Sequence, residues 1–93
     1  MLEKEIEKKV CDYAKTKNVL AYKFVSPSNR GVPDRLFVTE NGIAFFIEFK
    51  AKGKKPTPLQ ESKMQTLRKH KALVFLVDDV ELGKIIINNM IGR

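Results

Sequence analysis

Three absences narrow the classes of protein to which this 93-residue chain can belong. Cys11 is its only cysteine, which excludes an internal disulfide and a cysteine-based zinc cluster. No apolar run approaches the roughly 18 residues that a membrane-spanning helix needs. The amino terminus is charged and helical in pattern, so we expect no signal peptide. A cytoplasmic protein is the default expectation.

Acidic residues are in the minority, because 18 lysines and arginines stand against 11 aspartates and glutamates, for a net charge of +7. A basic excess indicates a polyanionic partner such as a nucleic acid, although scattered surface lysines on a soluble protein give the same composition. The length predicts one domain over residues 1–93 with one modest core. We find no internal repeat, low-complexity segment or domain linker.

The most informative stretch is a predicted β-hairpin within residues 31–50. Its first apolar run begins at Asp34 and its second ends with Glu48 and Lys50, with an Asn-Gly turn signal between them. Because the two ends of a hairpin meet in space, we expect these three charged side chains to converge. Side chains alternate along a strand, so Glu48 and Lys50 share one face. The opposite, apolar face is predicted to be core and comprises Ile43, Phe45, Ile47 and Phe49.

The register of the hairpin decides whether the two acids meet. A two-residue Asn-Gly turn would place Asp34 opposite Phe49, on the wrong face. A three-residue loop over residues 40–42, with its glycine in the left-handed region, places Asp34 opposite Glu48 instead. Directly opposed Cβ atoms lie roughly 4.5–5.5 Å apart, so two carboxylates there repel each other unless a divalent cation binds both. We therefore predict a metal site, with its register set by the three-residue loop or by a bulge elsewhere in the hairpin.

Pro33-Asp34, followed on the next strand by Glu48-x-Lys50, resembles the PD-(D/E)xK signature of restriction-endonuclease-like nucleases. The wider pattern adds Gly31-Val32 before it and Pro58-Leu59-Gln60 after it, and is similar to the VRR-Nuc family, in particular its small stand-alone members of virus and prophage type. The similarity covers nearly the whole chain. It implies a restriction-endonuclease-like fold and a metal-dependent nuclease.

The resemblance implies roles for individual residues. Asp34 and Glu48 would bind Mg²⁺ or Mn²⁺, and the backbone carbonyl of Phe49 would be a third ligand. Lys50 would stand near the same phosphate, where it would orient a water molecule or stabilise developing negative charge.

A helix is predicted over residues 2–17 from an apolar stripe at helical spacing. The family often contributes a metal-linked glutamate from its first helix, and Glu7 resembles that residue, with Glu3 as the competitor. Both glutamates would otherwise be solvated partners of neighbouring lysines. The stripe comprises Leu2, Ile6, Val10, Tyr13 and Ala14.

A second helix is predicted to begin at Pro58, with Thr57 as its N-cap. Gln60 has two interpretations. It completes a capping box with Thr57, or it belongs to the active site, as the matching glutamine does in the family. We favour the second, because Gln60 shares the sheet-facing side of the helix with Met64, Leu67 and Lys71.

Cationic side chains around the predicted site are candidates for binding nucleic acid. Arg30 lies in the turn-rich loop before Asp34, and we favour it over Arg35, which alternates away from Asp34. The loop after the hairpin is either a solvated surface or a lip that contacts phosphates. Its candidate residues are Lys52, Lys54 and Lys55.

The remaining elements complete an α/β fold. Residues 18–25 and 72–77 are predicted strands, the second covered on both faces. Asp78 or Asp79 is expected to cap a final helix that ends at Gly92. Its apolar stripe is assigned to Leu82, Ile85, Ile86 and Met90, widened by Ile87 and Ile91. The order α-β-β-β-α-β-α forms a mixed sheet flanked by helices, and the surplus apolar surface predicts a homodimer.

The sequence therefore predicts a Mg²⁺- or Mn²⁺-dependent DNA endonuclease. The resemblance implies branched DNA, such as four-way junctions, as its substrate. Two alternatives remain: a nuclease acting on flapped, nicked or single-stranded DNA, and a non-catalytic basic module that binds nucleic acid. The module does not explain Asp34 and Glu48, which repel phosphate unless a cation is bound.

Overall fold

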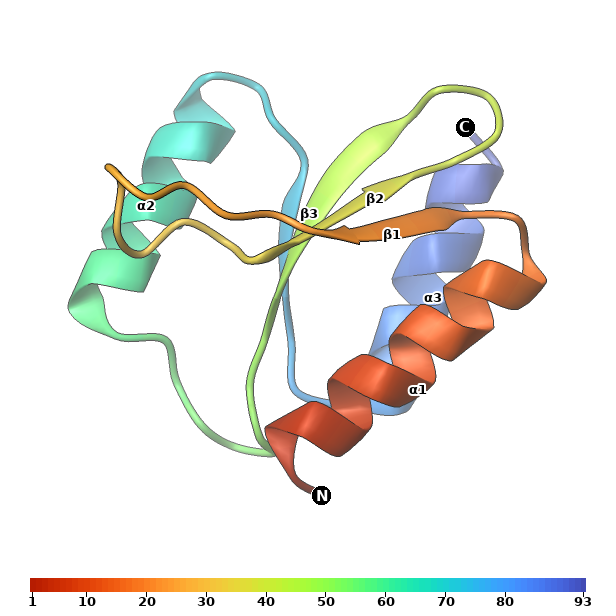
Figure 1. Cartoon of the computed structure of the whole chain (residues 1–93), viewed down its shortest axis with the longest axis horizontal. Helices are drawn as coiled ribbons and strands as arrows, with labels where there is room; N and C mark the ends of the chain where they lie inside the picture. Colours follow the sequence, from red (N-terminus) through yellow and green to blue (C-terminus); the bar gives the residue numbers. More distant parts are fainter.

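A computed structural model describes all 93 residues as a four-stranded mixed sheet with three helices (Figure 1). It confirms the predicted α/β class and the predicted order of elements. No helix combines the length and the apolar character needed to cross a membrane. The elements are α1 (Glu3–Thr16), β1 (Leu20–Lys23), β2 (Arg35–Val38), β3 (Ala44–Phe49), α2 (Pro58–Lys69), β4 (Val74–Val77) and α3 (Val80–Ile91).

The strands lie in the order β1-β2-β3-β4. β1, β2 and β3 form an antiparallel meander, and β4 joins β3 in parallel. A parallel neighbour cannot be reached by a tight turn, because the chain must first return to the starting end of the sheet. Helix α2 makes that return (Figure 1).

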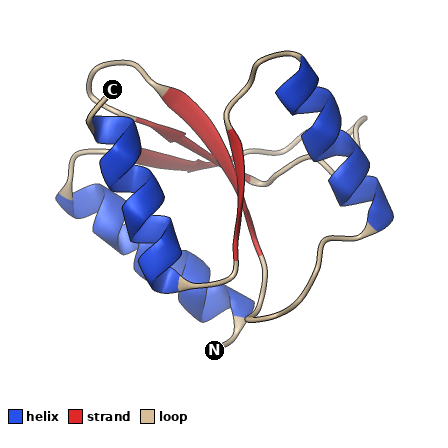
Figure 2. Cartoon of the chain, turned by 180° about the vertical axis from the view of Figure 1, so that it is seen from behind, coloured by secondary structure: helices blue, strands red, loops and turns tan.

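The two faces of the sheet are covered differently. Figure 2 shows the sheet nearly edge-on, with α1 and α3 packed together on one side and α2 standing on the other. The core lies under α1 and α3 and contains the predicted Phe45, Ile47 and Phe49, with Ile43 half-buried at its edge. The other core members are Ile6, Val10, Ala14, Val19, Phe37, Val77, Ile86, Ile87 and Met90.

The hairpin register is the predicted one. Arg35 pairs with Ile47, so the same register continued by one residue places Asp34 opposite Glu48. The loop has three residues and is closed by hydrogen bonds from the Gly42 amide to the Thr39 carbonyl (3.0 Å) and from the Thr39 amide to the Ile43 carbonyl (2.9 Å). Gly42 has a φ of +86°, in the left-handed region, as this type of loop requires.

Two strand predictions were too long. Asn18 is not part of a strand, because it has a φ of +57° and follows the carboxyl-terminal cap of α1. The Val19 amide then bonds to the Ala14 carbonyl at 2.9 Å, which completes the helix end. The last strand begins at Val74 rather than at Ala72. In the same way Lys71, predicted to extend the sheet-facing side of α2, lies beyond the end of that helix with a φ of +69°.

The stripe assigned to α3 was wrong in part. Leu82 and Ile85 are exposed, whereas Ile87 is fully buried and Gly83 also faces the core. Gly83 explains the rotation, because a Cβ atom at this residue would lie only 2.5 Å from Cγ2 of Val10 on α1. The missing side chain lets α3 approach α1 closely, and the face that carries the glycine becomes the buried one.

Candidate active site

Asp34 and Glu48 lie together on the face of the sheet opposite α1 and α3. Asp34 directly precedes β2, and its carbonyl accepts a hydrogen bond of 2.8 Å from the Phe24 amide, which holds the chain against the end of β1. Its side chain is exposed. Glu48 is the fifth residue of β3 and is only 6% exposed. One carboxylate is therefore open to a ligand while the other is buried beside it.

The environment of Glu48 favours the protonated carboxyl group. Burial, followed by the nearby charge of Asp34, raises the pKa of Glu48 to about 7. The charge of Lys50 lowers this pKa, and the charges of Glu3 and Glu7 raise it. The hairpin register sets Asp34 opposite Glu48, and the charges of Asp34 and Lys50 therefore act on the Glu48 carboxyl group.

Gln60 satisfies the geometry of both interpretations at once. Its backbone amide donates to Oγ1 of Thr57 (3.1 Å), and its side-chain Oε1 accepts from the Thr57 amide (2.9 Å), which is a complete capping box. The remaining amide nitrogen, Nε2, donates to Oε2 of Glu48 at 3.4 Å. The capping box therefore fixes the rotamer that brings this side chain to the buried acid.

The loop that carries Asp34 is packed against the start of α2. Gly31 has a φ of +87°, and a Cβ atom there would lie 2.8 Å from Cγ of Leu59. Pro33 is fully buried. Glycine therefore permits a close approach between this loop and Leu59, the residue before Gln60. This contact sets the distance between the loop that carries Asp34 and the helix that carries Gln60.

Lys50 and Phe49 are held at the end of β3. The Lys50 amide donates to the Val77 carbonyl of β4 at 2.9 Å, and its side chain is half-buried. The Phe49 side chain is 1% exposed in the core on the opposite face. Packing of Phe49 and pairing of Lys50 with β4 together fix the backbone that separates Glu48 from Lys50.

The position of Glu7 reveals a contact that sequence reasoning missed. Arg35 Nε donates to Glu7 Oε2 at 2.5 Å, and both side chains are largely buried. Arg35 points to the α1 side of the sheet, as its alternation from Asp34 predicted, and it takes up one oxygen of Glu7. Glu3 is exposed on the first turn of α1. The sequence carried only part of the signal, because alternation put Arg35 on the face away from Asp34 but did not specify that the helix carrying Glu7 covers that face.

Comparisons with known proteins agree with this geometry. No family model matches the sequence. The solved structure named "VRR_NUC domain" has a TM-score of 0.84 with this fold and is 26% identical, over 92% of this chain and 94% of that chain. "Putative nuclease p44" of Acyrthosiphon pisum secondary endosymbiont phage 1 is 42% identical over 90 residues, which cover 90% of each protein. This chain belongs to the VRR-Nuc family of nucleases.

The donor atoms of the VRR-Nuc site suit a hard divalent cation. No three His, Cys, Asp or Glu side chains form a ready metal cage. Mg²⁺ does not need one, because it is commonly bound through one or two carboxylates and keeps several waters. The opposed carboxylates of Asp34 and Glu48 meet that requirement, and oxygen donors suit Mg²⁺ and Mn²⁺. A cation would also relieve the repulsion that raises the pKa of Glu48.

The cationic candidates of this VRR-Nuc chain lie on loops. Arg30 is exposed in the loop before Asp34, and Lys54 and Lys55 are exposed in the loop after β3. Lys52 differs from them, because its Nζ lies 3.7 Å from Oδ1 of Asp79 at the start of α3. Arg30, Lys54 and Lys55 therefore have no acidic partner. Lys52 has one, but the ion pair is exposed to solvent and is expected to be weak.

Proposed function

We propose that this nuclease is a Mg²⁺- or Mn²⁺-dependent DNA endonuclease in which Asp34 and Glu48 bind the metal. The observation that carries the proposal is the register of the hairpin, which sets an exposed carboxylate opposite a buried one on a single face. On a chain with a net charge of +7, such a pair has no evident use in binding a polyanion directly.

Each residue around the pair has a part in hydrolysis. A bound metal ion supplies Lewis-acid stabilisation of the phosphoryl oxygens and lowers the pKa of a water molecule. The carbonyl of Phe49 is the third protein ligand in this proposal. The ammonium group of Lys50 donates a hydrogen bond to a phosphate oxygen and stabilises negative charge as it develops.

Gln60 and Glu7 position the reactants. The Nε2 group of Gln60, already directed at Glu48 by the capping box, keeps one Glu48 oxygen in place and orients water beside it. Glu7 uses the oxygen that Arg35 does not take to orient a water or a second ion. Glu3, at the exposed end of the same helix, is the alternative for this part.

Arg30, Lys52, Lys54 and Lys55 bind the phosphates that flank the cleaved bond. They lie on the two loops that leave the ends of the hairpin, next to Asp34 and Lys50. Contacts of this kind fix the position of DNA without reading its sequence. Binding is therefore expected to depend steeply on salt.

Branched DNA, such as a four-way junction, is the proposed substrate, and a homodimer is the proposed active form. One small domain with one site cuts one strand, so paired cuts need two subunits. Exposed apolar side chains on α3 remain available for a subunit contact: Leu82, Ile85 and Ile91. Sedimentation at micromolar concentration is expected to give a dimer, and a monomer contradicts this part of the proposal.

The expected place of action is the cytoplasm of a host cell, a proposal supported by the phage origin of the 42% identical relative.

Cleavage of labelled DNA tests the function. We expect four-way junctions to be cut faster than flaps, nicked duplexes, plain duplexes and single strands in Mg²⁺ or Mn²⁺, and no cutting in EDTA. Asp34→Ala and Glu48→Ala abolish cutting, whereas Glu40→Ala, in the hairpin loop at the far end of the same strands, does not. Cleavage that persists in EDTA or in both alanine variants overturns the mechanism. Faster cutting of flaps or single strands changes only the substrate.

A further inference from the structure

We propose that Asp78 is a positioning residue for DNA binding, because its carboxylate fixes the backbone of the basic loop that follows β3. The basic loop is residues 51–56, which include Lys52, Lys54 and Lys55. The inference rests on the proposed function, in which this loop binds DNA phosphates. It adds a residue from the end of β4, 25 residues along the chain from Gly53, to the residues that determine how DNA is held.

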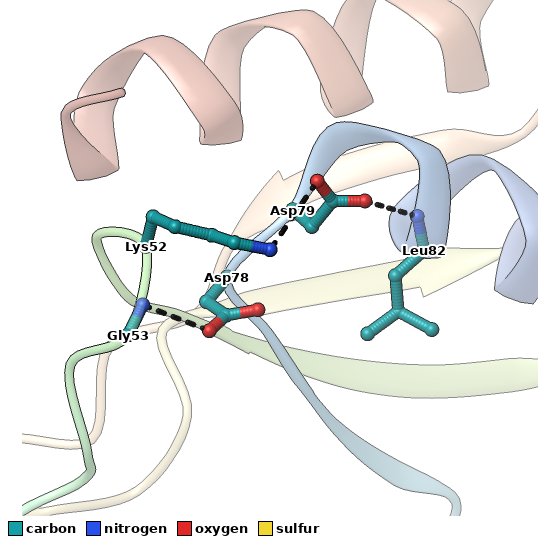
Figure 3. Close-up of polar contacts among 5 residues, drawn as sticks. All are labelled: Lys52, Gly53, Asp78, Asp79 and Leu82. Carbon is teal, nitrogen blue, oxygen red and sulfur yellow. Dashed lines mark hydrogen bonds and ion pairs between the residues drawn. The ribbon is translucent and has the colours of Figure 1, made fainter.

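One hydrogen bond ties the basic loop to the rest of the protein. The Gly53 amide donates to Oδ2 of Asp78 at 3.0 Å (Figure 3). Within the loop the Lys54 amide bonds to the Ala51 carbonyl at 2.9 Å, which forms a local turn. No other backbone group of residues 51–56 is hydrogen-bonded to another part of the chain. The carboxylate of Asp78 therefore decides where this turn sits.

The anchor is itself well fixed. Asp78 directly follows Val77, which is fully buried and whose carbonyl accepts the Lys50 amide at 2.9 Å. The end of β4 thus holds both the catalytic candidate Lys50 and, one residue later, the loop that follows it. The hydrogen bond from Gly53 to Asp78 therefore fixes the lysines of the basic loop relative to the sheet.

The neighbouring Asp79 makes a different contact. Its Oδ2 accepts the Leu82 amide at 3.1 Å and caps α3, while its Oδ1 lies 3.7 Å from Nζ of Lys52 (Figure 3). Asp78 therefore holds a backbone group, and Asp79 holds a side chain that the proposed function assigns to phosphate. In this proposal Asp79 competes with DNA phosphates for the Lys52 side chain, whereas Asp78 holds the loop backbone in the conformation that binds DNA.

Because of this difference, removing the Asp78 carboxylate and removing the Asp79 carboxylate are expected to change DNA affinity in opposite directions. If only charge mattered, removing either carboxylate would strengthen binding to a polyanion. An ordered loop loses less conformational freedom on binding than a mobile one, so losing the Asp78 anchor weakens binding despite the gain in positive charge. Asp78→Asn separates the two effects, since asparagine removes the charge and keeps an oxygen that can accept the Gly53 amide.

The test compares three variants for binding to a short fluorescent DNA duplex in EDTA, where no cleavage occurs. We expect Asp78→Ala to weaken binding about fivefold or more and Asp78→Asn to bind at least as tightly as the wild type. Asp79→Asn, which retains a good N-cap, is expected to bind about two- to threefold more tightly. In cleavage assays with metal, Asp78→Ala is expected to raise KM much more than it lowers kcat.

Amide exchange of Gly53 reports the tether directly. Exchange is expected to accelerate in Asp78→Ala and to stay near the wild-type rate in Asp78→Asn. The inference is overturned if Asp78→Ala binds DNA as tightly as Asp78→Asn, or if the Gly53 amide stays protected in Asp78→Ala. A wild-type protein that neither binds nor cuts DNA overturns the proposed function instead, and the Gly53 exchange then still decides whether Asp78 orders the loop.

Discussion

The two faces of the sheet are built by alternate residues of the same strands, and they differ in what they tolerate. Under α1 and α3, Phe37, Phe45 and Ile47 are fully buried in an apolar core. On the other face, Leu36 and Phe46 are only half-buried, and Glu48, which follows Phe46 on the same face of β3, is buried. The first face is packed for stability. The second accepts an acid, Glu48, whose ionised form is disfavoured both by burial and by the nearby charge of Asp34.

One structural feature serves both faces. The three-residue hairpin loop sets the register that sends the phenylalanines to the core and brings Asp34 and Glu48 together. A shift of one residue would exchange the faces. A change in the apolar core under α1 and α3 is therefore expected to alter stability, and a change among the charged residues around Glu48 to alter chemistry, which makes the comparison open to experiment.

Glu48→Gln, which keeps the shape of the side chain and removes its charge, is expected to have the strongest effect. Cleavage is expected to fall by about 100- to 1,000-fold or more, because a metal ligand is removed. The melting temperature of the metal-free protein at pH 8 is expected to rise, because a buried carboxylate beside Asp34 no longer has to be charged. Kinetics and calorimetry on one preparation check the fall in cleavage rate and the rise in melting temperature. A variant that melts at a lower temperature than the wild type contradicts this description of the site.

Gly83→Ala tests the packed face. The added Cβ atom would lie 2.5 Å from Val10 Cγ2, so we expect a loss of about 1–3 kcal/mol in the free energy of unfolding. Gly92→Ala is the matched control, since its Cβ atom meets nothing closer than 3.6 Å. Urea unfolding measures the loss, and Val10→Ala in the same chain should recover part of it. Cleavage by the folded protein is expected to stay at the wild-type level. A loss of cleavage without a loss of stability would contradict the assignment of stability to this face and of chemistry to the other.

The pH dependence of stability reports on Glu48 in the metal-free protein. Its pKa is about 7 in the folded state and close to the ordinary 4.5 when unfolded, so the folded state holds the proton more tightly. Stability is therefore expected to fall as pH rises from about 4.5 to about 7 and to change little above that. Allowing for solvent screening, the loss is about 1–2 kcal/mol.

Calorimetric melting of the wild type and Glu48→Gln across that pH range isolates this contribution, because the glutamine variant lacks it. Mg²⁺ is expected to stabilise the wild type relative to Glu48→Gln at pH 7 and above, because only the wild type keeps both carboxylates to bind the ion. A wild type that gains stability relative to Glu48→Gln as pH rises contradicts the direction of the shift.

A double-mutant cycle tests the contact between Arg35 and Glu7. Because both side chains are largely buried, we expect a coupling free energy of about 1 kcal/mol between Arg35→Met and Glu7→Gln in urea unfolding. Cleavage distinguishes the two glutamates, since Glu7→Gln is expected to slow it about tenfold and Glu3→Gln to leave it nearly unchanged. The opposite order would transfer the proposed part in the site to Glu3.

Single cations are expected to have the weakest effects. Replacing Arg30, Lys54 or Lys55 with glutamine is expected to lower DNA affinity a few-fold and to reduce the slope of log K against log salt by about 0.9 for each phosphate that is no longer neutralised. Lys69→Gln, near the far end of α2 from Gln60, is the control. Equal effects at Lys69 would mean that overall charge, and not these two loops, holds the DNA.

Local patterns in the sequence were enough to predict the hairpin and its register. Alternation, a turn signal and the requirement that two acids share a face predicted the three-residue loop and the buried side of β3. The capping box at Thr57 and Gln60 was equally local. These features depend on residues close in the chain, whose geometry is restricted by a few backbone conformations.

Contacts between distant elements were not predictable in the same way. The rotation of α3 depends on Gly83 meeting Val10, and helical spacing alone made Leu82 and Ile85 look equally suited to the core. The pairing of Arg35 with Glu7 and of Gly53 with Asp78 likewise joins segments 28 and 25 residues apart. Such contacts depend on how whole elements pack, which residue periodicity does not specify.

Anomalous scattering from crystals soaked in Mn²⁺ would show whether the two opposed acids share one ion. We predict one strong peak bonded to carboxylate oxygens of both Asp34 and Glu48, and no peak there in Asp34→Asn crystals grown in the same form. A wild-type crystal that is active in Mn²⁺ but binds the ion elsewhere, or through neither acid, would contradict the proposed site.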